Sequence, residues 1–142
     1  MGTRKALCVG VNQFANFPDA ALRGCVNDAN DMADVLQNIV GFAPADITIL
    51  TDSQATKANI MGTLENFVAE AQAGGVDYIA FSMSSHGTQV PDVSGDEPDN
   101  ADEAFCPYDV TSGGDAWAAD HIIIDDELRD LFLTLPQNVL LE

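Results

Sequence analysis

Short apolar runs alternate with helix-like patterns along much of this chain, and that order constrains its fold most. Three runs, residues 6–11, 46–51 and 77–83, are rich in β-branched and aliphatic residues and are typical of buried strands. The two stretches between them repeat apolar residues every three or four positions, as amphipathic helices do. Because parallel strands need a crossover connection, this order predicts an α/β fold: a mainly parallel sheet with helices on its faces, in a three-layer α/β/α sandwich.

Both predicted helices have sequence signals at their ends. The first follows Asn27-Asp28 and ends at Gly41, where a C-terminal glycine is expected. Its apolar positions are Met32, Val35, Leu36, Ile39 and Val40. The second is capped by Thr56 and stops at Gly74-Gly75. Its apolar positions are Ile60, Leu64, Phe67, Val68 and Ala71. We expect both sets to face the sheet.

The last third of the chain is less regular. Residues 87–120 are rich in Pro, Gly and Asp and have little periodicity, which predicts mostly loop. A short strand is expected at 122–124, a third helix at 125–135 and a fourth strand at 138–142. A parallel sheet cut within that strand would leave an open apolar edge. We therefore expect residues 1–142 to be the N-terminal portion of one larger domain.

The charge of the chain excludes some classes of partner. The sequence has 23 acidic and 5 basic residues, a formal net charge of −18. Nucleic acid and anionic membrane surfaces are not expected partners, because both bind basic surfaces. Hydrophobic residues still make up 46% of the chain, enough for a packed core. No apolar run approaches the roughly 20 residues that span a bilayer. Three cysteines without an export signal predict free thiols and a cytoplasmic location.

His86 is the residue best placed for catalysis. It follows the third predicted strand, and parallel sheets carry their sites beyond the carboxyl ends of their strands. The next residue, Gly87, lets the backbone approach a ligand closely. An imidazole at this position can act as a general base or a proton shuttle near neutral pH. The alternative is a structural or solvent-facing histidine at a strand end. His121, which abuts an apolar run, has weaker claims.

Five segments, taken together, resemble a known family. They are LCVGVN at 7–12, LRGCVND at 22–28, SSHGTQVPD at 84–92, DEA at 102–104 and IDDEL at 124–128. In this order they resemble the large-subunit region of the caspase-like cysteine peptidases, and most of all the metacaspase and orthocaspase branch. The resemblance covers nearly the whole chain. It implies a caspase-like fold and hydrolysis of peptide bonds by a Cys–His dyad.

The resemblance also implies roles for individual residues. His86 matches the catalytic histidine, and the amide of Gly87 would contribute to the oxyanion hole. Ser84 matches the family's serine two residues before the histidine, and Cys25 matches a non-catalytic cysteine beside the substrate groove. The nucleophilic cysteine belongs to a motif at the end of the next strand, beyond Glu142. A histidine without that thiolate cannot form the acyl-enzyme, so this chain alone is expected not to cleave peptides.

Asp28 matches the metacaspase aspartate that lines the pocket for the substrate's P1 side chain. A buried carboxylate there suits the guanidinium of Arg or the ammonium of Lys. True caspases instead hold a P1 aspartate with an arginine, and Leu22 occupies that position here. The resemblance therefore favours cleavage after a basic residue. The alternative role for Asp28 is an N-terminal cap of the first helix, and the two roles could coexist.

Three acidic residues match the calcium-binding aspartates of metacaspases: Asp102, Asp125 and Asp126. Clustered carboxylates without balancing cations suit Ca²⁺, and no Lys or Arg occurs between residues 58 and 128. Calcium is thus the one cofactor that the resemblance allows, and none is required. The alternative for the pair at 125–126 is that acids are favoured in the first turn of a helix.

Three hypotheses of function follow. The first is a caspase-like cysteine endopeptidase that cleaves after Arg or Lys, with this chain as its N-terminal part. Its partners would be a peptide or protein substrate and the remaining C-terminal part of the domain. The second is a pseudopeptidase, an interaction module that kept the scaffold without the nucleophile. The third is an acidic calcium-binding domain. The cysteine at the end of the fourth strand distinguishes the first from the second.

Overall fold

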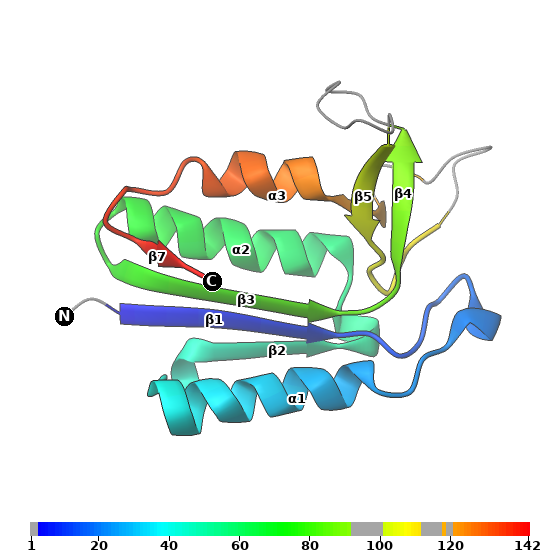
Figure 1. Ribbon diagram of the computed structural model, residues 1–142, viewed down its shortest axis with the longest axis horizontal. Coiled ribbons are helices and arrows are strands. Elements are labelled where there is room, and N and C mark those ends of the chain that lie inside the picture. Colours follow the sequence, from blue (N-terminus) through cyan, green and yellow to red (C-terminus); the bar gives the residue numbers. More distant parts are fainter. Residues whose placement is uncertain (1–2, 92–100, 112–117, 119–120) are drawn as a thin grey trace.

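Four parallel strands form the centre of the molecule. The computed structural model describes residues 3–91, 101–111, 118 and 121–142. The strands are β1 (Thr3–Gly10), β2 (Ile47–Thr51), β3 (Val76–Ser84) and β7 (Leu140–Leu141). They lie in the order β2-β1-β3-β7, and each neighbouring pair is parallel. The strand–helix alternation of the sequence therefore predicted the sheet correctly (Figure 1).

Helices cover both faces of this sheet. Helix α1 (Cys25–Val35), which continues into a π-helical turn (Leu36–Val40), lies on one face, and α2 (Lys57–Gln72) and α3 (Asp125–Phe132) lie on the other (Figure 1). Short 3₁₀ turns occur at 18–20, 44–46 and 52–54. The three-layer prediction is confirmed. None of the helices in the described ranges has both the length and the apolar character needed to cross a membrane.

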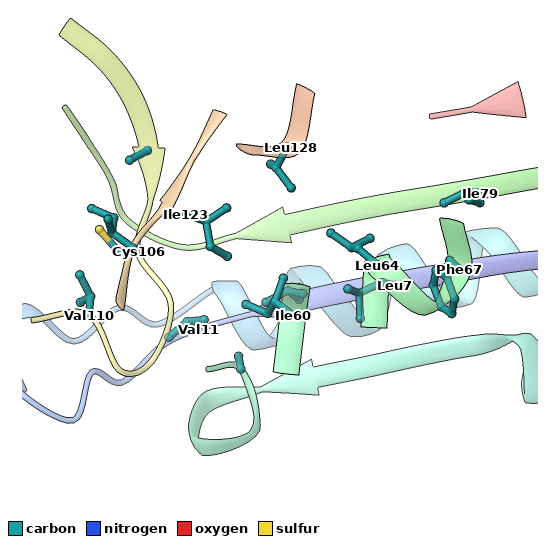
Figure 2. Packing of buried hydrophobic residues seen from close by; sticks show 14 of the residues in the cluster. Leu7, Val11, Ile60, Leu64, Phe67, Ile79, Cys106, Val110, Ile123 and Leu128 are labelled. Carbon is teal, nitrogen blue, oxygen red and sulfur yellow. The ribbon is translucent and has the colours of Figure 1, made fainter. Parts of the chain in front are cut away.

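Strand β1, in the middle of the sheet, buries both of its faces. Successive side chains of a strand point to opposite sides of the sheet. Leu7 and Val9 of β1 belong to the cluster on the α2 side, whereas Ala6 and Cys8 belong to the cluster on the α1 side. Figure 2 shows Leu7 among Ile60, Leu64 and Phe67 of α2. All five positions predicted for the apolar face of α2 are buried.

The first helix differs from its prediction in its start and in its buried face. It begins at Cys25, and its buried residues are Cys25, Ala29 and Ala33, followed by Leu36 in the π-helical turn. Three predicted face residues are instead exposed: Met32 (40%), Val35 (42%) and Ile39 (79%). Small side chains let α1 approach Ala6 and Cys8 of the sheet closely. Because alanines add little to an apolar pattern, the larger Met32, Val35 and Ile39 dominated the prediction.

The prediction of mostly loop for residues 87–120 missed two strands, although residues 106–111 do form no strand or helix. Strands β4 (Gly87–Pro91) and β5 (Ala101–Phe105) form an antiparallel pair, and β5 also pairs with β6 (Ile123–Ile124). Proline fits in β4 because that strand has a partner on one side only. Ala104 and Ile123 are buried in the main core, so long-range packing stabilises these strands without local periodicity. Residues 92–100, 112–117 and 119–120 lie outside the described part.

Several predicted boundaries are confirmed. The side chain of Thr56 accepts a hydrogen bond from the Asn59 amide at 3.2 Å and so caps α2. Gly74 follows α2 with φ of +87°, a conformation that favours glycine. The predicted fourth strand pairs with β3, with Tyr78 beside Leu140 and the Phe81 amide donating to the Glu142 carbonyl. The third helix ends at Phe132, three residues earlier than predicted.

Candidate active site

The connection between β3 and β4 places His86 at the carboxyl edge of the parallel sheet. Strand β3 ends at Ser84 and β4 begins at Gly87, so His86 lies in the tight turn between them. The arrowheads of β1, β2 and β3 point toward this same edge in Figure 1. The strand-end position expected from the sequence is thus confirmed.

Two neighbours orient the His86 ring. Its Nε2 lies 2.7 Å from the carbonyl oxygen of Ala20, and its ring centroid lies 5.3 Å from that of Phe14. A carbonyl oxygen can only accept a hydrogen bond, so Nε2 carries the proton of the neutral ring. Nδ1 is then the nitrogen that can accept another proton. The half-buried imidazole is therefore held by specific contacts and does not simply face solvent.

A largely apolar cleft of about 220 Å³ lies beside this histidine. It is lined by Phe14, Phe17, Ala20, His86, Gly87, Thr88, Cys106 and Val110. Two hydrogen bonds hold the backbone of Cys106 beside His86. The Cys106 amide donates to the His86 carbonyl at 3.0 Å, and the Ser85 hydroxyl donates to the Cys106 carbonyl at 2.6 Å. Figure 2 shows Cys106 and Val110 beyond the arrowhead of β3. A cleft of this size can accept a single apolar side chain next to the imidazole.

The structure brings two of the predicted substrate-binding residues together. The hydroxyl of Ser84 donates to Oδ2 of Asp28 at 2.9 Å. Asp28 is exposed and lies within the first turn of α1, so the expectation of a buried carboxylate is not met in this chain. The capping alternative for Asp28 is also wrong. Gly24 is the N-cap residue, and Oδ1 of Asn12 accepts from the amides of Cys25 (2.9 Å) and Val26 (3.3 Å) instead.

All three cysteines are buried free thiols. Cys8 is a core residue of β1, as its sequence context predicted, and burial raises its pKa to about 11. Burial also raises the pKa of Cys106, which lines the cleft. Because the thiolate is the reactive form, neither residue is suited to be a nucleophile near neutral pH. Cys25 opens α1 but is not among the residues that line the cleft.

The structure places the three predicted calcium ligands on β5 and in the first turn of α3. Oδ1 of Asp125 is buried without a hydrogen-bond partner among the described residues, and Asp125 lines a hollow of about 330 Å³ together with Glu103. Asp126 is instead paired with Arg129 at 3.1 Å. Asp102 lies in β5 opposite Val90. No group of three His, Cys, Asp or Glu that could hold a metal occurs among the described residues.

Sequence reasoning missed the residues that support the site. The contact of Ala20 with His86 uses a backbone carbonyl, which has no signature in the sequence. Asp109 was also missed: its Oδ1 accepts from the Lys57 amide at 2.9 Å, and its Oδ2 lies 3.0 Å from Nδ1 of His121. Asp109 and Lys57 are 52 residues apart in the sequence, so no local signal could have suggested this contact.

This chain is similar to known proteins both in sequence and in fold. The family model for the metacaspase peptidase C14 domain matches residues 4–142. Metacaspase-1A of Aspergillus niger is 38% identical over 138 residues, which cover 93% of this chain and 31% of that protein. Metacaspase-1 of Emericella nidulans is 39% identical with the same coverage. A crystal structure of a Geobacter sulfurreducens protein superposes with a TM-score of 0.72 at 33% identity, over 98% of this chain and 48% of that chain. The chain thus spans about a third of the length of these curated relatives.

Proposed function

Because this chain belongs to the metacaspase peptidase C14 family, a family of cysteine peptidases, we propose that it forms the histidine-bearing part of a cysteine endopeptidase. One observation carries the proposal: His86 stands at the carboxyl edge of the sheet with Nε2 bonded to the Ala20 carbonyl. This contact selects the tautomer in which Nδ1 is free to act as the base.

The reaction would use His86 twice. Nδ1 removes the proton of the cysteine thiol, and the thiolate attacks the scissile carbonyl to form a tetrahedral intermediate. The amide of Gly87 would help to stabilise the oxyanion. The same imidazole then protonates the leaving amine as the C–N bond breaks, which leaves a thioester. Water, deprotonated by Nδ1, releases the acyl group and restores the thiol.

The nucleophile would come from the remaining part of the domain. The curated relatives are about three times as long as this chain, which leaves room for such a part. All three cysteines of residues 1–142 are buried, and burial keeps Cys8 and Cys106 protonated near neutral pH. We therefore expect residues 1–142 alone to cleave no peptide. Where no cysteine follows β7, the same scaffold would act as a pseudopeptidase.

We further propose that the substrate's P1 residue is Arg or Lys. The exposed carboxylate of Asp28 lies at the end of β3 with its Oδ2 bonded to Ser84, which leaves Oδ1 for a ligand. No Lys or Arg of the described residues forms an ion pair with Asp28. An incoming guanidinium or ammonium would supply the missing cation and form charge-assisted hydrogen bonds.

Peptide cleavage by the longer product of the same gene tests this proposal. It should cleave fluorogenic peptides that end in Arg or Lys and leave Asp-ended peptides intact. Asp28→Asn should lower kcat/KM for the Arg peptide roughly tenfold to hundredfold, because one partner of a charged contact is lost. Asp31→Asn is the matched control, since Asp31 is an exposed acid on the same helix. Cleavage after Asp, or equal effects of both variants, would contradict the proposed specificity.

Calcium binding is a second candidate function, favoured by the unpartnered Oδ1 of Asp125. A buried carboxylate oxygen without a donor beside an acidic hollow suits a hard cation. Calorimetry of this chain with CaCl₂ should give a binding heat that Asp125→Asn removes. Asp130→Asn, an exposed acid on the same helix, should leave the heat unchanged. The absence of any heat at millimolar calcium would exclude the site in this chain.

A further inference from the structure

The loop that supports His86 is closed by a single backbone hydrogen bond. The Leu22 amide donates to the carbonyl of Asn12 at 2.6 Å, so the two ends of the segment 12–22 meet. Both groups that touch the His86 ring, the carbonyl of Ala20 and the ring of Phe14, lie within this segment. The position of the imidazole therefore depends on how the closed loop is fixed to the sheet.

Asp52 fixes the start of that loop. It follows β2, and its Oδ1 accepts hydrogen bonds from the amides of Asn12 (2.8 Å) and Gln13 (3.0 Å). These two amides come immediately before Phe14. The side chain of Asn12 in turn caps α1 through the amides of Cys25 and Val26. One carboxylate after β2 thus anchors the start of the loop that follows β1 and leads into α1. The middle of the loop is held separately, because the Ala15 amide donates to the Tyr108 carbonyl at 3.0 Å and the Asn16 side chain donates to the Val110 carbonyl at 3.2 Å.

The backbone of Asp52 is itself unusual. Among the described residues it is the only one other than glycine with a positive φ, +45°. L-residues pay a steric penalty in this region, which glycine avoids. A glycine at position 52 would remove the strain but also the carboxylate. Strained residues of this kind persist where the surrounding structure requires them, often beside functional sites.

We propose that Asp52 is a positioning residue for His86. Its carboxylate holds the amides of Asn12 and Gln13, which fixes the start of the closed loop 12–22 just before Phe14, and the loop presents the Ala20 carbonyl to Nε2 of His86. The consequence for catalysis rests on the proposed peptidase function. The positioning itself is a property of residues 1–142 and can be measured without any catalysis.

Nuclear magnetic resonance of the ¹⁵N-labelled chain tests the inference. In the unaltered chain, His86 should populate the Nε2–H tautomer alone and show a downfield, hydrogen-bonded Nε2–H proton. Asp52→Gly keeps the backbone conformation accessible and removes only the carboxylate. In this variant we expect loss of the downfield proton, a mixture of both His86 tautomers, and hydrogen exchange at the Leu22 amide faster by about tenfold.

Three controls separate positioning from a general loss of structure. Asp52→Asn keeps Oδ1 as an acceptor, and asparagine tolerates the left-handed backbone. Unlike Asp52→Gly, this variant should therefore keep the single His86 tautomer. Asp46→Gly removes a carboxylate that is paired with Lys5 before β2 starts, away from the loop, and should leave His86 unchanged. His121 is the internal reference in every spectrum, because its partner is Asp109.

Two results would overturn the inference. The first is that Asp52→Gly still shows His86 as a single Nε2–H tautomer, although faster hydrogen exchange at the Leu22 amide shows that the loop has loosened. The second can be measured in the unaltered chain, so it does not depend on whether any variant folds. If the amides of Asn12 and Gln13 exchange as fast as unprotected amides, Asp52 does not hold them.

In the proposed complete peptidase, Asp52→Gly should lower kcat with little change in KM. An inactive parent protein would refute the peptidase proposal and leave the tautomer result standing.

Discussion

The interior of the sheet and its carboxyl edge are held together by different interactions. In the interior, β1 pairs with β2 and β3 along its length, and Leu7, Ile60 and Ile79 are completely buried. Stability there comes from apolar area that is shared by many side chains. At the edge, the support of His86 depends on single hydrogen bonds, such as that of Ala20 with Nε2 and those of Asp52 with the loop amides.

This difference separates stability from site geometry. A packed interior tolerates changes that keep its volume, because no single contact is essential. A hydrogen bond at the edge needs one donor and one acceptor, and its removal misplaces the group it holds. Substitutions in the interior should therefore change the free energy of unfolding, whereas substitutions at the edge should change the orientation of His86 at a small cost in stability.

The largest expected effect is in the interior. Leu7→Ala should lower the free energy of unfolding by about 2–5 kcal/mol, because a fully buried side chain leaves a cavity. His86→Ala, at the edge, should lower it by less than about 1 kcal/mol. Urea denaturation followed by circular dichroism measures both values. Equal losses of unfolding free energy in the two variants would contradict the difference between the interior and the edge.

Gly10 lies where the two regions meet, at the end of β1. A Cβ atom there would lie 2.2 Å from the Cys25 carbonyl oxygen, a backbone atom that cannot move aside easily. Gly10→Ala should therefore cost about 1–3 kcal/mol of unfolding free energy. Gly62→Ala is the matched control: it lies within α2 with nothing within 4 Å, and should stabilise the chain by about 0.5–1 kcal/mol. Denaturation measures both free energies of unfolding, and changes of the same sign in the two variants would contradict this account.

The thiol of Cys8 should make the interior sensitive to alkaline pH. Burial favours the neutral thiol and raises its pKa from 9.0 to about 11. Between these values the unfolded chain has released the proton and the folded chain has kept it, so stability falls as pH rises. Over this pH interval the free energy of unfolding of Cys8→Ala should fall by about 2–3 kcal/mol less than that of the unaltered chain. Denaturation at pH 8.5 and 11 measures the difference, and identical pH dependences would be inconsistent with a protonated buried thiol.

A small effect is also expected at the start of α2. Thr56→Ala removes the side-chain oxygen that accepts from the Asn59 amide, and should cost about 1 kcal/mol. Thr56→Ser keeps an acceptor and should restore most of that loss. Thermal unfolding of the unaltered chain and of the two variants gives their order of stability. A Ser variant as unstable as the Ala variant would show that the hydroxyl contributes nothing as a cap.

The interior could be predicted from the sequence because its signals are periodic. Apolar residues at helical spacing identified the buried face of α2, and apolar runs identified the parallel strands. The face of α1 could not be found in this way, because Ala29 and Ala33 bury little area and gave no signal beside the larger Met32, Val35 and Ile39. The β4–β5 pair was missed because its strands are stabilised by partners far away in the sequence.

The edge was predictable only where a side chain carries the chemistry. The position of His86 at this edge follows from the end of its predicted strand, and its proposed role follows from the resemblance of the surrounding segment to the family. The Ala20 carbonyl that bonds to it belongs to an ordinary residue, and the left-handed backbone of Asp52 is a property of the folded chain. Asp28 and Ser84 were each named from the sequence, but their mutual hydrogen bond needed the structure.

The most direct test of the central claim compares the two histidines of this chain in the proposed complete peptidase, in which the remaining part of the domain follows residues 1–142. His86→Ala and His121→Ala are measured for kcat/KM with an Arg-ended peptide. If His86 is the base at the edge of the sheet, its removal should lower kcat/KM by at least about a hundredfold, the usual contribution of general acid–base catalysis. His121→Ala, which breaks only the contact with Asp109, should keep most of the activity. Full activity in His86→Ala would contradict the account.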